Sequence, residues 1–100
     1  MVAHEAELDP VIHAQARLRI MATLVELDEG DELHFPRLRS LLGMTAGNLS
    51  THLSKLEAAG YVRQAKSFSG RTPATYLSLT LEGRLAFRRY LDNLNALLGS

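Results

Sequence analysis

The sequence predicts a mostly α-helical domain that carries one small β-hairpin. Three observations support this fold class: apolar residues recur at helical spacing, glycine or proline marks most segment ends, and an extended region is divided by a turn at residues 70–73. One hundred residues is a usual size for a single domain. The expected order is a helix, a short strand, two helices, a two-stranded hairpin and a last helix.

The first helix is expected over residues 10–28. Asp9 can cap the free amide groups at a helix start, and Pro10 suits the first helical position. Apolar residues then follow densely: Val11, Ile12, Leu18, Ile20, Met21, Leu24, Val25 and Leu27. Gly30 lies near the expected end of this helix. We expect residues 1–8 to form a flexible N-terminus and residues 9–100 to form the domain.

Two shorter helices are expected after an extended segment at residues 32–35. The second helix covers residues 36–42 and ends at Gly43. Its leucines are expected to face inward: Leu38, Leu41 and Leu42. The third helix begins at its cap Thr45, continues to residue 59 and stops at Gly60. Its expected inward stripe has leucines at spacings of four and three: Leu49, Leu53 and Leu56.

The hairpin and the last helix complete the pattern. Residues 61–69 and 74–79 are expected to be strands, and Thr80 is expected to cap a helix that runs to about Leu98. Two helices joined by a glycine-containing turn form a helix-turn-helix unit. A hairpin directly behind the second of these helices is a wing. The sequence therefore predicts a winged helix-turn-helix fold.

Charge is unevenly distributed, although the whole chain is formally neutral. Residues 1–32 contain two arginines and eight acids, a balance of −6, whereas residues 33–75 contain six basic residues and one acid, a balance of +5. Residues 76–100 are close to neutral, at +1. A basic middle of the chain is typical of a surface that meets nucleic-acid phosphates. A chance distribution over a solvated surface is the alternative.

The third helix carries small, polar and basic side chains outside its leucine stripe. No acid occurs from Thr45 to Lys55, whereas solvated helix faces usually mix glutamate with lysine. The major groove of DNA admits a helix, and side chains of these types can bond to base edges or phosphates. The expected DNA contacts are Thr45, Ala46, Gly47, Asn48, Ser50, Thr51, His52 and Lys55. An ordinary solvated face is the alternative.

The hairpin and the second helix supply further basic residues. An arginine at a hairpin tip can enter the minor groove, where the potential is most negative over narrow A·T segments. We expect DNA contacts from three wing residues: Lys66, Arg71 and Thr72. Arg63 is a weaker candidate because it can lie on the far face of the sheet. Either Arg37 or Arg39 is expected to touch phosphate, with Arg37 preferred. The alternative is that the basic residues of the wing do not contact DNA and instead discourage aggregation, as basic residues on edge strands do.

A continuous motif leads from the third helix into the hairpin and on to the last helix. Residues 48–62 read NLSTHLSKLEAAGYV, and residues 75–83 read TYLSLTLEG after Arg71-Thr72-Pro73. These stretches resemble the recognition helix, the wing and the last-helix entry of small winged-helix regulators related to the MarR and ArsR families. The resemblance covers about residues 9–98. It implies a transcriptional regulator that binds operator DNA as a homodimer, usually to repress transcription.

The two terminal helices have more apolar surface than a domain of this size can bury internally, which favours an interface. The resemblance places them at a two-fold axis, which suits half-sites roughly 34 Å apart. The expected interface residues are Val11, Ile12, Leu18, Tyr90, Leu91, Leu94, Leu97 and Leu98. The alternative is that both helices simply close a monomer core. A small-molecule effector would bind at this interface or between it and the DNA-binding unit.

Other functions have little support in the sequence. The chain has no cysteine and only four scattered histidines, so we expect neither a metal nor a cofactor. No phosphate-binding loop or nucleophile motif indicates an enzyme. The first ten residues do not resemble a signal peptide and no apolar run could span a membrane, so a cytoplasmic protein is expected. A winged helix that binds only proteins is the alternative function, although such modules usually lose their basic residues.

Overall fold

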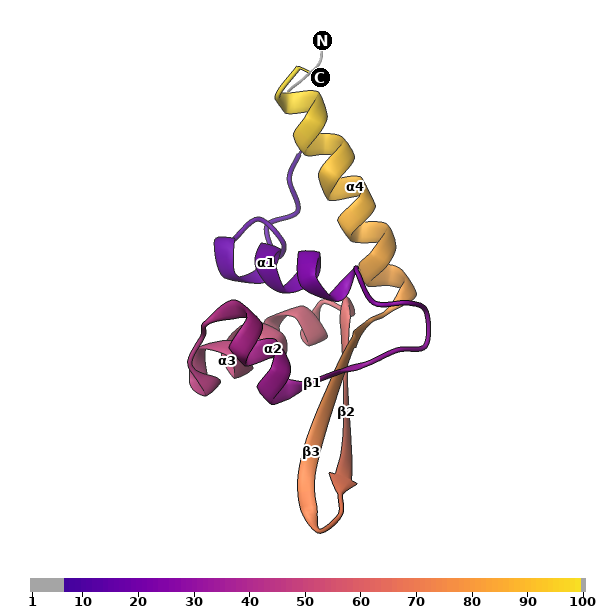
Figure 1. The fold of residues 1–100 in the computed structure, drawn as a ribbon. Helices are drawn as coiled ribbons and strands as arrows, with labels where there is room; N and C mark the ends of the chain where they lie inside the picture. Colours follow the sequence, from indigo (N-terminus) through magenta and orange to yellow (C-terminus); the bar gives the residue numbers. More distant parts are fainter. Residues whose placement is uncertain (1–6, 100) are drawn as a thin grey trace.

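The computed structural model describes residues 7–99 and has the predicted winged-helix architecture (Figure 1). In chain order, the elements are α1 (Gln15–Leu24), β1 (Leu33–His34), α2 (Phe35–Leu42), α3 (Ala46–Ala58), β2 (Val62–Ser69), β3 (Thr72–Leu79) and α4 (Leu81–Leu97). The first three helices lie together beside the base of the hairpin, the wing extends to one end, and α4 extends to the other. These two projections make the molecule long, with extents of 57 × 26 × 21 Å.

The sheet has the antiparallel order β1-β3-β2. Ser69 pairs with Thr72, so Gly70 and Arg71 form a two-residue turn, and the φ of +66° at Gly70 fits a type II′ turn. The strand β3 therefore begins two residues earlier than predicted. Pro73 is tolerated within it because β1 pairs with β3 only at residues 76 and 77, which leaves that edge of the wing open.

The core lies where the helices meet the base of the sheet. All three leucines of the predicted α3 stripe are fully buried, and α4 contributes Phe87 and Tyr90. The larger buried side chains are Ile12, Ile20, Met21, Leu24, Leu38, Leu42, Leu49, Leu53, Leu56, Val62, Leu77, Leu79, Phe87 and Tyr90. Leu41, which was expected to face inward, is 49% exposed. A two-turn helix buries only one narrow side, and in α2 that side is taken by Leu38 and Leu42.

The first helix is shorter than the predicted span 10–28. Asp9 does cap a turn, because its Oδ1 accepts from the backbone N of Val11 at 2.8 Å, but Ala14 is extended and α1 begins only at Gln15. Tertiary contacts explain the break. Ile12 is fully buried within the turn, and the Nε of Arg17 donates to the Val11 carbonyl at 2.5 Å. The bond from Arg17 occupies the Val11 carbonyl, which would accept a backbone hydrogen bond in a continuous helix.

The end of α1 is also set by a distant residue. The helix stops at Leu24, and Gly30 lies several residues beyond it in a turn with a φ of +90°. The Arg84 guanidinium on α4 donates to the carbonyls of Val25 and Leu27 at 3.4 and 3.1 Å. An arginine 57 residues away in the sequence thus satisfies carbonyls that follow the helix.

The joint between the wing and α4 is tight. Thr80 caps α4, as predicted, by accepting from the backbone N of Gly83 at 2.9 Å, and its hydroxyl donates to the Gly60 carbonyl at 2.6 Å. A Cβ added at Gly83 would lie 2.1 Å from the carbonyl oxygen of Tyr61. Only glycine fits at this position, which explains the glycine that follows the Leu-Thr pair at the entry to α4.

The N-terminal segment reaches α4 before α1 begins. Residues 1–6, most of the expected flexible segment 1–8, lie outside the described residues. Leu8 packs against the core, and the Asn93 side chain donates to the Glu7 carbonyl at 2.9 Å. Across residues 7–99, the helices are too short or too polar to cross a lipid bilayer.

Candidate nucleic-acid interface

The helix α3 presents a polar surface on the side away from its buried leucines. The Thr45 side chain caps it by accepting from the backbone N of Asn48 at 3.1 Å, as predicted. The Thr51 hydroxyl donates to the Gly47 carbonyl at 3.0 Å, which leaves its oxygen free to accept another bond. The exposed residues on this helix and its cap are Thr45, Ala46, Gly47, Asn48, Ser50, Thr51, Ser54 and Lys55, followed in the last turn by Glu57 and Ala58. Seven of the eight residues expected to contact DNA on this helix therefore lie on the exposed surface.

His52 is placed differently from the other candidates on α3. Its ring is half-buried, and its Nδ1 lies 3.3 Å from Nη1 of Arg17 on α1. Because a guanidinium only donates, this contact requires an unprotonated Nδ1 and leaves the ring proton on Nε2. Burial, followed by the charges of Arg17 and Lys55, lowers the pKa of His52. His52 is therefore suited to an uncharged hydrogen bond rather than to an ionic phosphate contact.

Two arginines of α1 hold the helix-turn-helix in place. Arg17 bridges the Val11 carbonyl and His52 on α3. Arg19 donates from Nη2 to the Leu42 carbonyl at the end of α2, at 2.9 Å. Neither arginine was among the residues predicted from the sequence to contact DNA. One feature of the sequence sets them apart: within the acidic first third of the chain, these two arginines are the only Lys or Arg residues.

The wing places its basic residues on defined sides of the hairpin. Side chains alternate along a strand, so Lys66 lies on the same face as buried Val62, and Arg63 lies on the opposite face. Arg71 is exposed in the turn, and Thr72 is the exposed first residue of β3. The far-face position considered for Arg63 is confirmed by the strand register, in which it pairs with Ser78.

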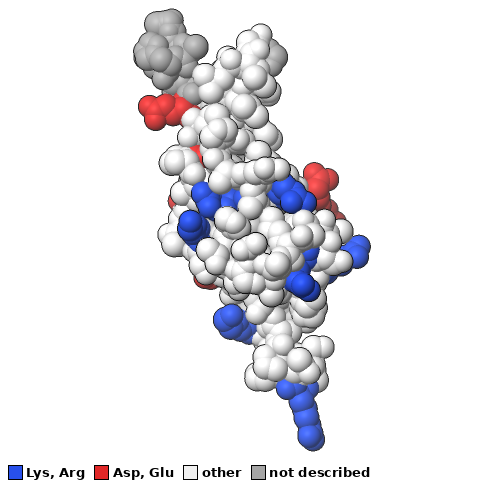
Figure 2. All heavy atoms as spheres, turned by 90° about the vertical axis from the view of Figure 1, so that its left-hand side faces the viewer, with Lys and Arg blue, Asp and Glu red and all other residues white. Residues whose placement is uncertain are grey.

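Basic side chains also surround the helical body. Arg37 and Arg39 are both exposed on α2, and Arg39 lines a hollow with Gly43 and Thr45 beside the start of α3. Figure 2 faces the side on which α2 and α3 lie: Lys and Arg atoms are spread over the body and down to the end of the wing, whereas Asp and Glu atoms lie at the upper end and the margins. This face is complementary in charge to a polyanion.

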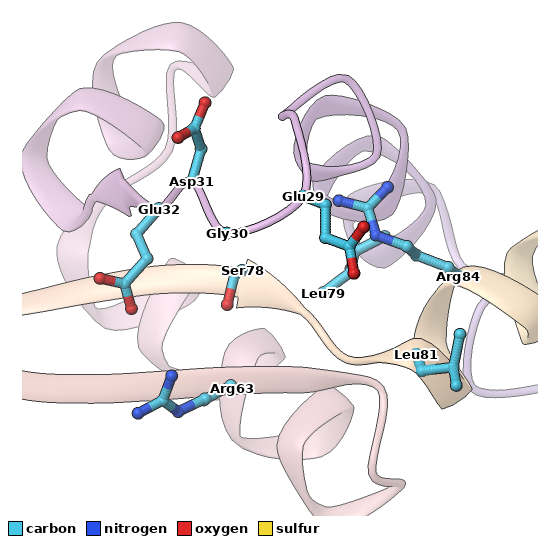
Figure 3. A pocket seen from close by; sticks show the side chains of 9 residues that line it. All are labelled: Glu29, Gly30, Asp31, Glu32, Arg63, Ser78, Leu79, Leu81 and Arg84. Carbon is cyan, nitrogen blue, oxygen red and sulfur yellow. The ribbon is translucent and has the colours of Figure 1, made fainter.

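A hollow of about 510 Å³ at the base of the hairpin has mixed charge (Figure 3). It is formed by the loop before β1, the outer face of the hairpin and the start of α4. Its charged lining residues are Glu29, Asp31, Glu32, Arg63 and Arg84. The acids of this loop would repel phosphates, so Arg63 lies in an environment unsuited to DNA. Within the described part of the chain, no three His, Asp or Glu side chains are grouped as metal ligands.

The residues expected at a dimer interface divide into two groups. Ile12 and Tyr90 are 0% and 2% exposed within the single chain, so their assignment to an interface is wrong and both belong to the core. Tyr90 instead bonds through its hydroxyl to Nδ1 of His13 at 2.9 Å. Val11, Leu18 and Leu94 are half-buried, and the remaining three are exposed: Leu91, Leu97 and Leu98.

Comparisons with known proteins agree with this geometry. Residues 16–98 match the family described as winged helix DNA-binding domain. An uncharacterized protein of Methanocaldococcus jannaschii is 35% identical over 81 residues, which cover 81% of this chain and 85% of that protein.

Solved structures show the same fold. A transcriptional regulator homologue from Pyrococcus horikoshii superposes with a TM-score of 0.84 at 28% identity, covering 99% of this chain and 96% of that one. Bacillus subtilis PadR in complex with operator DNA gives a TM-score of 0.65 at 16% identity, covering 78% of this chain and 48% of PadR. The chain therefore belongs to the winged helix DNA-binding domain family.

Proposed function

We propose that this protein is a sequence-specific regulator of transcription that binds double-stranded DNA as a homodimer and represses by occupying its operator. In this proposal, residues 45–59 enter the major groove, and residues 66–74 of the wing contact the adjacent minor groove or backbone. The exposed α3 surface carries the proposal, because it offers amide, hydroxyl and ammonium groups without any acid from Thr45 to Lys55.

The roles of individual residues follow from their positions. Asn48, Ser50 and Thr51 lie at the exposed first turns of α3, where side chains reach base edges in this type of fold. Lys55 on α3 and Lys66 and Arg71 on the wing supply positive charge for phosphates. The α3 surface thus reads sequence, and the basic residues fix the protein on the duplex.

The dimer proposal rests on the apolar surface of α4. Leu85, Leu91 and Leu97 are 46%, 41% and 44% exposed, and Leu98 is 72% exposed. The first two line a groove of about 510 Å³ together with Val25 and Phe87. Self-association through α4 would cover this surface and place two copies of α3 on one face of the DNA.

Selection of bound sequences from a random duplex pool tests the proposed function. We expect enrichment of a palindromic site whose half-sites are separated by about one helical turn, roughly 34 Å. Asn48→Ala and Thr51→Ala are expected to change which bases are enriched at one position of each half-site, and Ser54→Ala is the matched control on the same helix. Failure to enrich any sequence above the starting pool would overturn sequence-specific binding.

A further inference from the structure

The end of the wing carries an exposed aromatic side chain. Phe68 is 68% exposed, and the other exposed large apolar side chains within residues 7–99 are leucines. It lies two residues before the turn and pairs across the hairpin with Pro73. An apolar ring at the end of a projection is accessible to a binding partner, and its surroundings decide which kind of partner it fits.

The strand register places Phe68 on the side of the wing that faces the helices. Val62, Gln64, Lys66 and Phe68 alternate onto one face of β2. Their partners Leu79, Leu77, Thr75 and Pro73 share that face, and both of these leucines are buried in the core with the helices. The Phe68–Pro73 pair therefore continues the surface that begins at α3 toward the end of the wing.

The surroundings of Phe68 favour DNA over a protein as its partner. Lys66 and Arg71 flank it, and residues 58–81 contain no acid. The apolar patch consists of one ring and one proline, whereas a stable protein interface buries about 800 Å² on each partner. Proteins that bind the minor groove frequently bring apolar side chains, including phenylalanine and proline, into it and insert them between base steps.

We propose that Phe68, supported by Pro73, packs against the sugar edges of the minor groove while Lys66 and Arg71 hold the adjacent phosphates. This inference rests on the proposed function and adds an apolar contact to a wing for which only polar and basic contacts were expected. Such a contact removes apolar surface from water without neutralising a phosphate. It therefore strengthens binding by an amount that does not depend on salt.

The test compares the affinity of variants for the selected duplex over a range of salt concentrations. Phe68→Ala is expected to weaken binding about tenfold, the effect of losing about half of a buried phenylalanine contact, with an unchanged salt slope. Phe68→Leu is expected to retain most of the affinity. Arg71→Ala is expected to reduce the magnitude of the slope by about 0.9, the value for one lost phosphate contact. Leu81→Ala, which truncates an equally exposed side chain at the base of the hairpin, is the control and leaves binding unchanged.

The outcomes separate the inference from the proposed function. If the unmodified protein binds the duplex but Phe68→Ala binds within twofold of it, the apolar wing contact is wrong and the proposed function stands. If the unmodified protein binds no duplex, the proposed function fails. Light scattering on Phe68→Ala supplies the second readout: an unchanged mass supports a DNA contact, and a fall to the monomer mass assigns Phe68 to self-association and overturns the inference.

Discussion

The two projections of the molecule differ in chemistry. The wing ends in Lys66, Phe68 and Arg71 within a stretch that has no acid, whereas the outer end of α4 and its cap present exposed leucines at positions 91, 97 and 98. Both extend from one body whose core is closed within the single chain (Figure 1). The wing has the charge to meet a polyanion, and the α4 end has the apolar surface to meet a protein.

This difference shows how a small domain separates two partner surfaces. The core uses residues from all four helices and the base of the sheet, including Phe87 and Tyr90 of α4. The exposed side chains toward the outer ends of the wing and of α4 lie outside it. Side chains on each projection can therefore serve a partner without destabilising the fold. The exception is the joint between the projections, where the Gly60–Tyr61 segment meets the start of α4.

The largest effect on stability is expected from Gly83→Ala, which places a methyl group in the joint between the wing and α4. The new Cβ would meet the Tyr61 carbonyl at 2.1 Å, so α4 and β2 must move apart. We expect a loss of about 3 kcal/mol in the free energy of unfolding, measured by urea denaturation. Gly47→Ala is the matched control on α3, where a Cβ meets nothing within 4 Å. It should gain up to about 1 kcal/mol from helix propensity. Equal effects of the two changes would contradict the close packing at Gly83.

The next largest effect is expected on self-association through the exposed leucines of α4. Charges introduced by Leu91→Asp and Leu97→Asp together should make a two-fold interface on α4 unfavourable, because carboxylates would be buried against leucines. Light scattering should then report a monomer, while the circular dichroism of the folded domain is retained. Leu81→Asp, on an exposed leucine at the other end of α4, serves as the control and should leave the mass unchanged. A monomer mass for the unmodified protein would rule out the dimer itself.

The smallest effect is a pH dependence at the contact between α1 and α3. The pKa of His52 is lowered from 6.5, chiefly by burial, so the folded state binds this proton less readily than the unfolded state. Stability contributed by neutral His52 is therefore present above pH 6.5 and is lost as the pH falls below that value. Comparing urea midpoints at about pH 7.5 and about pH 5.5 should show a smaller fall for His52→Gln than for the unmodified protein. An equal fall of the urea midpoint in both proteins would show that His52 does not cause the pH dependence.

Tyr61 offers a second titration at the joint. Its hydroxyl donates to Oδ2 of Asp9, and this bond raises the pKa of Tyr61 to about 12. The bond stabilises the fold below pH 10, and this contribution is lost as the pH rises from 10 toward 12. Tyr61→Phe should flatten the alkaline loss of stability measured by urea denaturation. An unchanged alkaline profile would contradict the Asp9 contact.

The sequence was sufficient for features that depend on local pattern. The element order, the caps Thr45 and Thr80, and the leucine stripe of α3 follow from spacing and capping rules, and all are present. The start of α1 was misplaced because Arg17 and Ile12 make tertiary contacts that no local rule contains. Long-range contacts therefore account for the largest error in the fold.

The candidate site was predictable to a similar degree. The exposed residues of α3 followed once its leucines were assigned to the core. The contact between Arg17 and His52 could not be anticipated, because 35 residues separate the two in the sequence. Ile12 and Tyr90 were misassigned because an apolar residue in a terminal segment looks the same in sequence whether it faces the core or a partner. Phe68 was overlooked because alternation does not reveal how far a wing extends beyond its core.

The central claim is that α3 and the wing bind the DNA backbone together. It is tested by measuring how the affinity for duplex DNA depends on salt concentration. The two proteins compared are the unmodified protein and the Lys55→Ala, Arg71→Ala double variant. We expect the logarithm of the unmodified protein's affinity to fall linearly with the logarithm of salt concentration. The double variant should bind more weakly, with a slope reduced in magnitude by about 1.8 for two lost phosphate contacts. Equal affinities and equal slopes for the two proteins would contradict the proposed docking.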